Sequence, residues 1–300
     1  MRVPGPAWKS ILLWLLLLSC APQAVAGGSE RALLWSIESD QGRVGYLLGT
    51  IHSEDPRVLE FTDAFLEALH GCSHFAMELV PNLPTLAGLT EAMRLPPQTE
   101  LAALVGVGRF EAVVQALGAY GVDREQAARM KPWAAMMTLS VPPPKTGFFM
   151  DFSLSLRASG QGLTVIGLET LEEQLKFLED MSLSQQLSLL DQALAETAQV
   201  QQVHDRMVDI YLSGDLEALR VETMEQLSVL EPGVREVFLA EGIAGRNHRM
   251  FARLLESLQL GTVFAAVGAL HLPGEEGLIA LLRNAGYRVS AMPPPFPPRN

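Results

Sequence analysis

Two histidines in this sequence close copies of the same local pattern. The segment GYLLGTIH ends at His52 and FAAVGALH ends at His271, so each is an apolar strand that runs into G-x-x-H. The glycine permits a sharp exit from the strand and a close approach of other backbone. Each histidine would then project at the carboxyl edge of a sheet, where ligand sites concentrate. A single copy is more often a hydrogen-bonded strand end, but two matched copies favour a functional site.

A carboxylate supplies an acidic partner for these histidines. Glu78 follows the apolar residues 75–77, where an ionised carboxylate is costly unless it meets a cation or hydrogen-bond donors. A divalent metal ion held by His52, Glu78 and His271 would satisfy it, with water completing the coordination. Manganese, cobalt and zinc are all compatible with these ligands. Such an ion would lower the pKa of its bound water and polarise a carbonyl, so the pattern predicts hydrolysis.

Three further residues are candidates for assisting this chemistry. Glu169 closes the apolar strand 165–168 and could take a proton, or could simply stabilise the start of a helix at 171–178. Asn247 shares an apolar helical stripe, so it should point inward and needs hydrogen-bond partners. Arg246 could bind a carboxylate or stabilise an oxyanion, or could pair structurally with Glu78 or Glu169.

Other histidines and motifs carry less weight. His70, Cys72 and His74 resemble a metal cluster by composition, but a turn at a helix end would scatter the three side chains. His204 and His248 are expected on helix surfaces. The chain has no H-E-x-x-H, G-x-S-x-G, P-loop or C-x-x-C motif, which argues against zincin, lipase, ATPase and dithiol redox mechanisms.

The elements that must position these residues cluster at the two ends of the chain. Apolar runs predict strands near both ends, and Glu-, Gln-, Ala- and Leu-rich patterns predict helices between them. Prolines at Pro56 and Pro273 are expected to open a helix after each histidine motif. The predicted strands are 33–37 and 44–48, which form a hairpin, with 75–79, 165–168, 263–267 and 287–291; the predicted helices cover 101–120, 124–139 and most of 171–260.

Strands from both ends must pair to form one sheet. We therefore predict an α/β or α+β fold with one mixed β-sheet made from N- and C-terminal strands, surrounded by helices, with a long helical middle section. Residues 27–300 are expected to be a single domain, and the Pro-rich tail 292–300 cannot join a sheet.

The N-terminus indicates export. Arg2 and Lys9 precede an apolar run at 11–18, too short to span a bilayer, and small residues follow it. Cleavage at an A-x-A site would remove residues 1–26, whereas a lipoprotein box at 17–20 would remove 1–19 and leave Cys20 acylated, giving membrane attachment through a lipid. The expected location is the periplasm, the outer membrane or the extracellular space. A net charge of −12 argues against nucleic acid as a partner.

The order of these motifs resembles the TraB/GumN family, which includes the TIKI proteases. The matching features are strand-G-x-x-H near the start, a glutamate closing the next strand, and strand-G-x-x-H-L-x-G near the end. MKPWAA at 130–135, GLET at 167–170 and the pair Arg246 and Asn247 also fit. Residues 149–151 match only loosely the G-x-D that commonly precedes the middle helix, so the role of Asp151 is in doubt.

The resemblance implies an exported, metal-dependent, peptidase-like hydrolase with a peptide substrate. Two alternatives follow from other relatives. Erythromycin esterase-like proteins imply that histidine and glutamate could hydrolyse a small ester without metal. Binding proteins of this group, and ChaN-like proteins, imply a protein that holds a peptide or an iron-containing ligand without turnover. Fold identity alone does not choose among the three.

Overall fold

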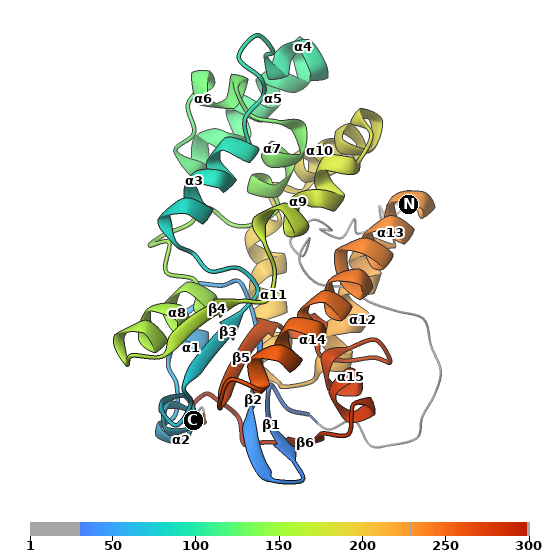
Figure 1. The fold of residues 1–300 in the computed structure, drawn as a ribbon. Helices are drawn as coiled ribbons and strands as arrows, with labels where there is room; N and C mark the ends of the chain where they lie inside the picture. Colours follow the sequence, from blue (N-terminus) through green and yellow to red (C-terminus); the bar gives the residue numbers. More distant parts are fainter. Residues whose placement is uncertain (1–30, 229, 299–300) are drawn as a thin grey trace, which may run out of the picture.

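One six-stranded sheet lies at the centre of the computed structural model, which describes residues 31–228 and 230–298. The C-terminal strand β5 lies between the N-terminal strands β2 and β3, so the two ends of the chain build one sheet (Figure 1). This confirms the predicted mixed sheet with helices around it. The strand order is β4-β3-β5-β2-β1-β6, with β1 (Leu34–Ser39), β2 (Gly42–Thr50), β3 (His74–Met77), β4 (Thr164–Gly167), β5 (Val263–Gly268) and β6 (Arg288–Ala291).

Four neighbouring strands run parallel and end at the same edge of the sheet. β2 pairs with β5 so that Thr50 lies opposite Gly268. β3 pairs with β5 and with β4, which places Met77 opposite both Ala266 and Gly167. The segments that leave these four strands therefore start side by side, as parallel pairing requires. The remaining pairs, β1 with β2 and β1 with β6, are antiparallel and include the predicted hairpin.

Glycines in β2 allow its neighbour to approach closely. A Cβ atom on Gly49 would lie 2.9 Å from the Cα of Ala269, and one on Gly45 would lie 2.3 Å from the carbonyl oxygen of Val263. Neither distance is tolerable for a real side chain. The glycine of the first G-x-x-H motif is thus required by packing against the second motif, as its predicted role in close approach implies.

Short, capped helices replace the continuous ones that the sequence pattern indicated. The helix after the first histidine motif is divided into α1 (Pro56–Leu59) and α2 (Asp63–His70), because Thr62 caps α2 by accepting the Phe65 N–H. The middle section contains α3 (Leu83–Ala92), α4 (Leu101–Val105), α5 (Val107–Leu117), η2 (Gly118–Tyr120), α6 (Arg124–Ala128), α7 (Pro132–Leu139), α8 (Met150–Gly160), α9 (Leu171–Asp180), α10 (Leu183–Glu196), α11 (Val200–Leu212), α12 (Leu216–Leu227), α13 (Pro232–Leu239), η3 (Ala240–Ala244) and α14 (Gly245–Leu258).

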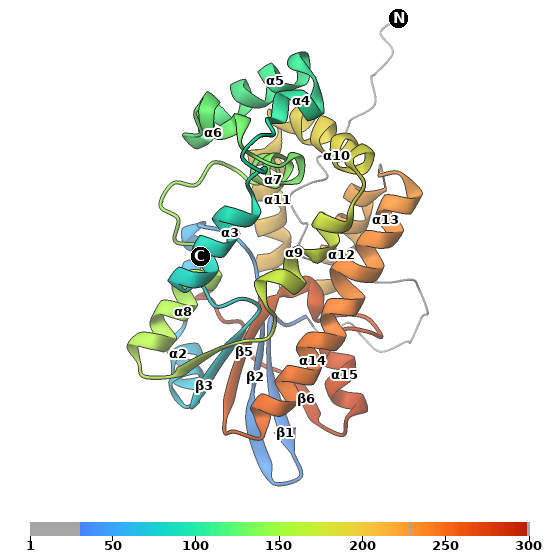
Figure 2. The same ribbon diagram turned by 45° about the horizontal axis from the view of Figure 1, so that its top comes forward.

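The described residues bury two hydrophobic clusters. One surrounds the sheet and includes Phe75, Phe264 and Leu254. The other lies among the helices and includes Trp133 and Phe238. Helices α3 to α7 gather beyond the carboxyl edge of the sheet, in green at the top of Figure 1, and Figure 2 shows the same arrangement from a second side. The edge where the predicted site residues emerge thus faces the helical region.

The helix expected to begin at Pro273 does not form. Residues 269–271 make a single 3₁₀ turn (η4, Ala269–His271), residues 272–277 form bends and turns, and α15 (Leu278–Asn284) begins only after Gly277. The reason is the backbone at Gly274, whose φ of 90° lies outside the helical range, and the turn is so tight that a Cβ on Gly277 would lie 2.2 Å from the Pro273 carbonyl oxygen. The chain must turn tightly here before the helix starts.

The C-terminal tail as far as residue 298 lies within the described residues, whereas the N-terminal segment does not. Residues 292–298 follow β6 without joining the sheet, as their prolines predict. The predicted export segment, including Cys20, lies outside the described residues. None of the helices within residues 31–228 and 230–298 is long and apolar enough to cross a bilayer.

Candidate functional site

A buried arginine joins the two predicted carboxylates. Arg246 on α14 is 1% exposed, and its Nη2 atom donates to Glu78 Oε2 and to Glu169 Oε2, each at 2.5 Å. Its Nε atom also donates to Glu169 Oε2 at 2.8 Å. Glu78 follows β3 and Glu169 follows β4, and the Glu169 N–H donates to the Glu78 carbonyl at 2.8 Å. The structural pairing of Arg246, left open by the sequence, therefore involves both acids.

Charge in this network is not balanced, because two carboxylates surround one guanidinium. Burial raises the pKa of Glu169 above its ordinary value and the negative charge of Glu78 adds to this, while Arg246 opposes both. Burial alone would lower the pKa of Arg246, but the two carboxylates raise it further above its ordinary range. Arg246 thus stays charged, and the cluster favours an additional positive charge beside it.

His271 lies next to the same cluster and is fully buried. Asn247 donates through Nδ2 to the Glu276 carbonyl at 2.8 Å, so its Oδ1 accepts from Nδ1 of His271 at 2.6 Å. This bond orients the imidazole ring and directs Nε2 toward Glu78 Oε1, 3.8 Å away. Glu78 Oε1 in turn accepts the Gly268 N–H at 2.7 Å. The predicted inward direction of Asn247 is confirmed, and its partner is the second motif histidine.

His52, in contrast, is half exposed. Its Nδ1 atom lies 3.7 Å from Asp151 Oδ2, and its ring stacks on Phe149 with centroids 3.9 Å apart. Thr50 donates to Asp151 Oδ1 at 2.5 Å. Burial would raise the pKa of Asp151, but the interactions with His52 and Thr50 outweigh it and lower that pKa below its ordinary value. Asp151, whose match to the family pattern was loose, therefore does partner the first motif histidine.

A loop is held over His52 by a carboxylate that the sequence analysis missed. Glu54 accepts the backbone N–H groups of Lys145, Thr146 and Gly147. The Met150 N–H also donates to the Ser53 carbonyl at 3.0 Å. These bonds fix the segment that carries Phe149 and Asp151 against the first histidine motif. No local pattern announces such a role, because a single exposed glutamate in a loop looks ordinary.

The expectation that His204 lies on a helix surface is wrong. Its side chain is only 12% exposed on α11, and within the described residues its Nδ1 atom is buried without a hydrogen-bond partner. Burial lowers the pKa of His204, although the carboxylate of Asp205, 3.7 Å from Nδ1, acts in the opposite direction. The signal was available, since Val200, His204, Met207 and Tyr211 share one helical stripe whose other members are buried.

The three predicted metal ligands do not form a single metal-holding group. Within residues 31–228 and 230–298, no set of three or more His, Cys, Asp or Glu side chains is arranged to hold a metal ion. His271 and Glu78 approach each other, but His52 is directed to Asp151, and Arg246 supplies positive charge to Glu78. Among the same residues, the His70, Cys72 and His74 segment forms no such group either. The metal requirement stays a prediction.

Comparison with known proteins agrees with the motif order. The model of the TraB/PrgY/gumN family matches residues 33–291. An uncharacterized protein of Treponema pallidum (strain Nichols) is 25% identical over 296 residues, covering 91% of this chain and 88% of that protein. A protein of Nematostella vectensis named "Metalloprotease TIKI homolog" is 29% identical over 168 residues, covering 48% of this chain and 36% of that protein. No solved structure matches the chain.

Proposed function

The chain belongs to the TraB/PrgY/gumN family, and from that premise we propose that it is a hydrolase acting on peptide or small ester bonds. One observation carries the proposal. Two carboxylates, a buried arginine and an oriented histidine converge at the carboxyl ends of β3, β4 and β5, beside the half-exposed His52 that follows β2. Converging titratable groups at this edge of a parallel sheet are typical of an active site.

Glu78 is the candidate general base. Its side chain is 15% exposed, so water reaches it, while the Arg246 side chain behind it is 1% exposed. Its carboxylate accepts hydrogen bonds from Arg246 and from the Gly268 N–H, which hold it in place to accept a proton as water attacks the substrate carbonyl. Nε2 of the buried His271 lies 3.8 Å from Glu78 Oε1, close enough to influence that carboxylate. Arg246 and Asn247 act as positioning residues, since neither reaches the substrate.

His52 is the candidate general acid. It is half exposed at this edge, and its Nδ1 atom lies 3.7 Å from Asp151, whose pKa is lowered and whose carboxylate can orient the ring. Protonated His52 donates its proton to the leaving nitrogen or oxygen as the carbon–nitrogen or carbon–oxygen bond breaks. The proton taken by Glu78 and the one given by His52 balance, so each turnover consumes one water molecule.

No step of this scheme passes through a metal ion, because the described residues do not gather three metal ligands. The name of the Nematostella relative nevertheless supports a metal-dependent version, with His52, His271 and Glu78 as ligands and Glu169 assisting. We keep that version as a proposal, with manganese, cobalt and zinc as the ions to test. Metal dependence and metal-free acid–base hydrolysis make opposite predictions with a chelator.

The decisive experiment measures peptide and ester hydrolysis by the purified chain, with and without a chelator and added Mn²⁺, Co²⁺ or Zn²⁺. Glu78→Gln and His52→Ala should each lower kcat about 100-fold or more, while His70→Ala on the surface of α2 should not. Activity that is indifferent to both site variants would overturn the proposal. Stable binding of a peptide or an iron-containing ligand without product would instead support the binding-protein alternative.

We also propose that the chain is exported through its N-terminal segment. The support is the pair Arg2 and Lys9 before the apolar run at 11–18. The mass of the mature N-terminus separates the two processing routes, because cleavage before Cys20 leaves an acylated cysteine and cleavage after residue 26 leaves none. A mature protein that begins at residue 1 would refute export by either route.

A further inference from the structure

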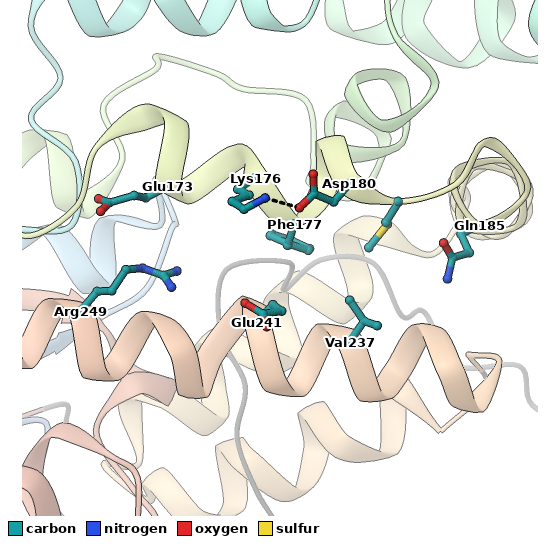
Figure 3. Close-up of a pocket in the computed structure, with 9 residues that line it drawn as sticks. Glu173, Lys176, Phe177, Asp180, Gln185, Val237, Glu241 and Arg249 are labelled. Carbon is teal, nitrogen blue, oxygen red and sulfur yellow. Dashed lines mark hydrogen bonds and ion pairs between the residues drawn. The ribbon is translucent and has the colours of Figure 1, made fainter.

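A pocket separate from the histidines opens beside the buried network. Its volume is about 440 Å³, within the range of small-molecule sites. Figure 3 shows it between α9 on one side and α13, η3 and α14 on the other. The lining combines apolar and charged side chains: Glu173, Lys176, Phe177, Asp180, Met181, Gln185, Val237, Glu241 and Arg249.

Three of the charged lining residues already have close partners. Lys176 donates to Asp180 within the pocket at 2.5 Å. Glu173 accepts from Arg253 at 2.6 and 2.8 Å, and these bonds lower the pKa of Glu173 to about 2. The charges of these groups are already paired within the protein, so they are poor candidates for binding a ligand.

Arg249 and Glu241 are different. Nε of Arg249 is buried, and within the described residues no hydrogen bond reaches it. Its Nη2 atom is 4.0 Å from Glu169 Oε1, too far for a hydrogen bond. In the same part of the chain, no ion pair or hydrogen bond holds the Glu241 carboxylate. Arg249 therefore has an Nε–H without a hydrogen-bond partner among the described residues, and the solvent-exposed Glu241 carboxylate, which interacts with Lys176 through its charge, lies open to a ligand.

These two groups face the same space next to Gly245. A methyl group on Gly245 would lie 3.4 Å from Nη1 of Arg249 and 3.6 Å from Oε2 of Glu241. Figure 3 shows Glu241 between Arg249 and Val237, so an apolar wall adjoins the charged pair. Phe177 and Met181 complete that wall from α9.

We propose that this pocket binds a short zwitterionic peptide with apolar side chains. Its carboxylate binds the planar guanidinium of Arg249, its ammonium group binds Glu241, and an apolar side chain packs on Phe177, Met181 and Val237. Because Arg249 also approaches Glu169, the bound peptide lies next to the carboxylate network. The inference rests on the proposed function, because a short peptide of this kind would be the terminal part of a peptidase substrate or a product of its hydrolysis.

The test is isothermal titration calorimetry of the full chain with leucyl-leucine at neutral pH. Arg249→Gln and Glu241→Gln should each weaken binding about tenfold or more, since each removes a charge-assisted hydrogen bond. The matched controls are Arg94→Gln and Glu236→Gln, which change exposed residues outside the pocket lining. Gly245→Ala keeps both charges, suits a helical backbone and should also weaken binding because its methyl group fills the shared space.

Three ligand variants test the assignment of the two ends. N-acetyl-leucyl-leucine lacks the ammonium group, leucyl-leucine amide lacks the carboxylate and glycyl-glycine lacks the apolar side chains, so each should bind more weakly than leucyl-leucine. Equal binding of the acetylated peptide, no effect of Arg249→Gln and Glu241→Gln, or no binding of leucyl-leucine at millimolar concentration would overturn the proposal.

The same data separate this inference from the hydrolase proposal. Dipeptide binding that depends on Arg249 and Glu241, in a chain that hydrolyses nothing, would support the pocket and overturn the hydrolase. Hydrolysis that depends on Glu78, in a chain that does not bind leucyl-leucine, would support the hydrolase and overturn the pocket.

Discussion

The Glu78–Arg246–Glu169 network and the His52–Asp151 pair follow neighbouring strands, yet one is buried and the other is half open to solvent. In the buried network, Arg246 and Glu169 are almost fully excluded from water and Glu78 is only 15% exposed, so an ion that loses its partner is costly. In the open pair, solvent can replace a lost partner. Substitutions in the Glu78–Arg246–Glu169 network should therefore mainly lower the stability of the fold. Substitutions in the His52–Asp151 pair should mainly lower activity.

The largest effect is expected when the arginine is removed from the buried network. Arg246→Met would leave two buried carboxylates uncompensated and should lower the free energy of unfolding by about 3–5 kcal/mol. Urea denaturation measures the change. Arg253→Met on the same helix is the matched control, because the side chains of Arg253 and its partner Glu173 are 34% and 28% exposed, and it should cost less than about 1 kcal/mol. If Arg246→Met and Arg253→Met lowered the free energy of unfolding equally, the contrast between the buried and the partly exposed ion pair would be wrong.

A substitution in the His52–Asp151 pair should lower activity strongly and stability only slightly. Asp151→Asn keeps an acceptor for Thr50 but removes the charge that orients and stabilises His52. We expect kcat to fall about 100-fold while the free energy of unfolding changes by less than about 1 kcal/mol. Activity assays and denaturation on one preparation provide both values. A variant that unfolds without a specific loss of kcat would show that Asp151 is structural.

A smaller effect is expected in the loop that covers His52. Glu54→Gln weakens a charged acceptor for three backbone N–H groups and should reduce stability by about 1–2 kcal/mol. Because Lys145 lies in this loop, trypsin should cut after it faster than in the wild-type chain. Glu60→Gln, an exposed residue near the end of α1, is the control. Unchanged cleavage would show that the prolines alone hold the loop.

The smallest expected effect concerns pH. The pKa of Glu173 is about 2, below its ordinary value of 4.5, because Arg253 binds its ionised form. Its contribution to stability is thus present above pH 4.5 and is lost as pH falls through about 2. Glu173→Gln should make the stability of the fold, measured by circular dichroism as a function of pH, depend less on pH in this acidic range. If the variant lost stability at low pH in the same way as the wild-type chain, other carboxylates would be responsible for that loss of stability.

Much of the fold was predictable because local pattern decides it. The hairpin, the strands at both ends and the helical middle follow from apolar periodicity and turn residues, and pairing of the two ends follows from the need to bury strand faces. The helix that failed at Pro273 shows the limit of this reasoning. Proline is compatible with a helix start, but the positive φ of Gly274 turns the chain away from a helix directly after Pro273.

The sequence by itself determined that His52, Glu78, Glu169 and His271 leave strand ends at one edge of the sheet. Only the tertiary structure decided which of them meet. Arg246 joins carboxylates 77 and 168 positions away, and Thr50 reaches Asp151 across 101 positions. Partners so far apart in the chain are selected by how whole elements pack, and no short pattern encodes that. The same reason explains why the role of Glu54 became visible only in the folded molecule.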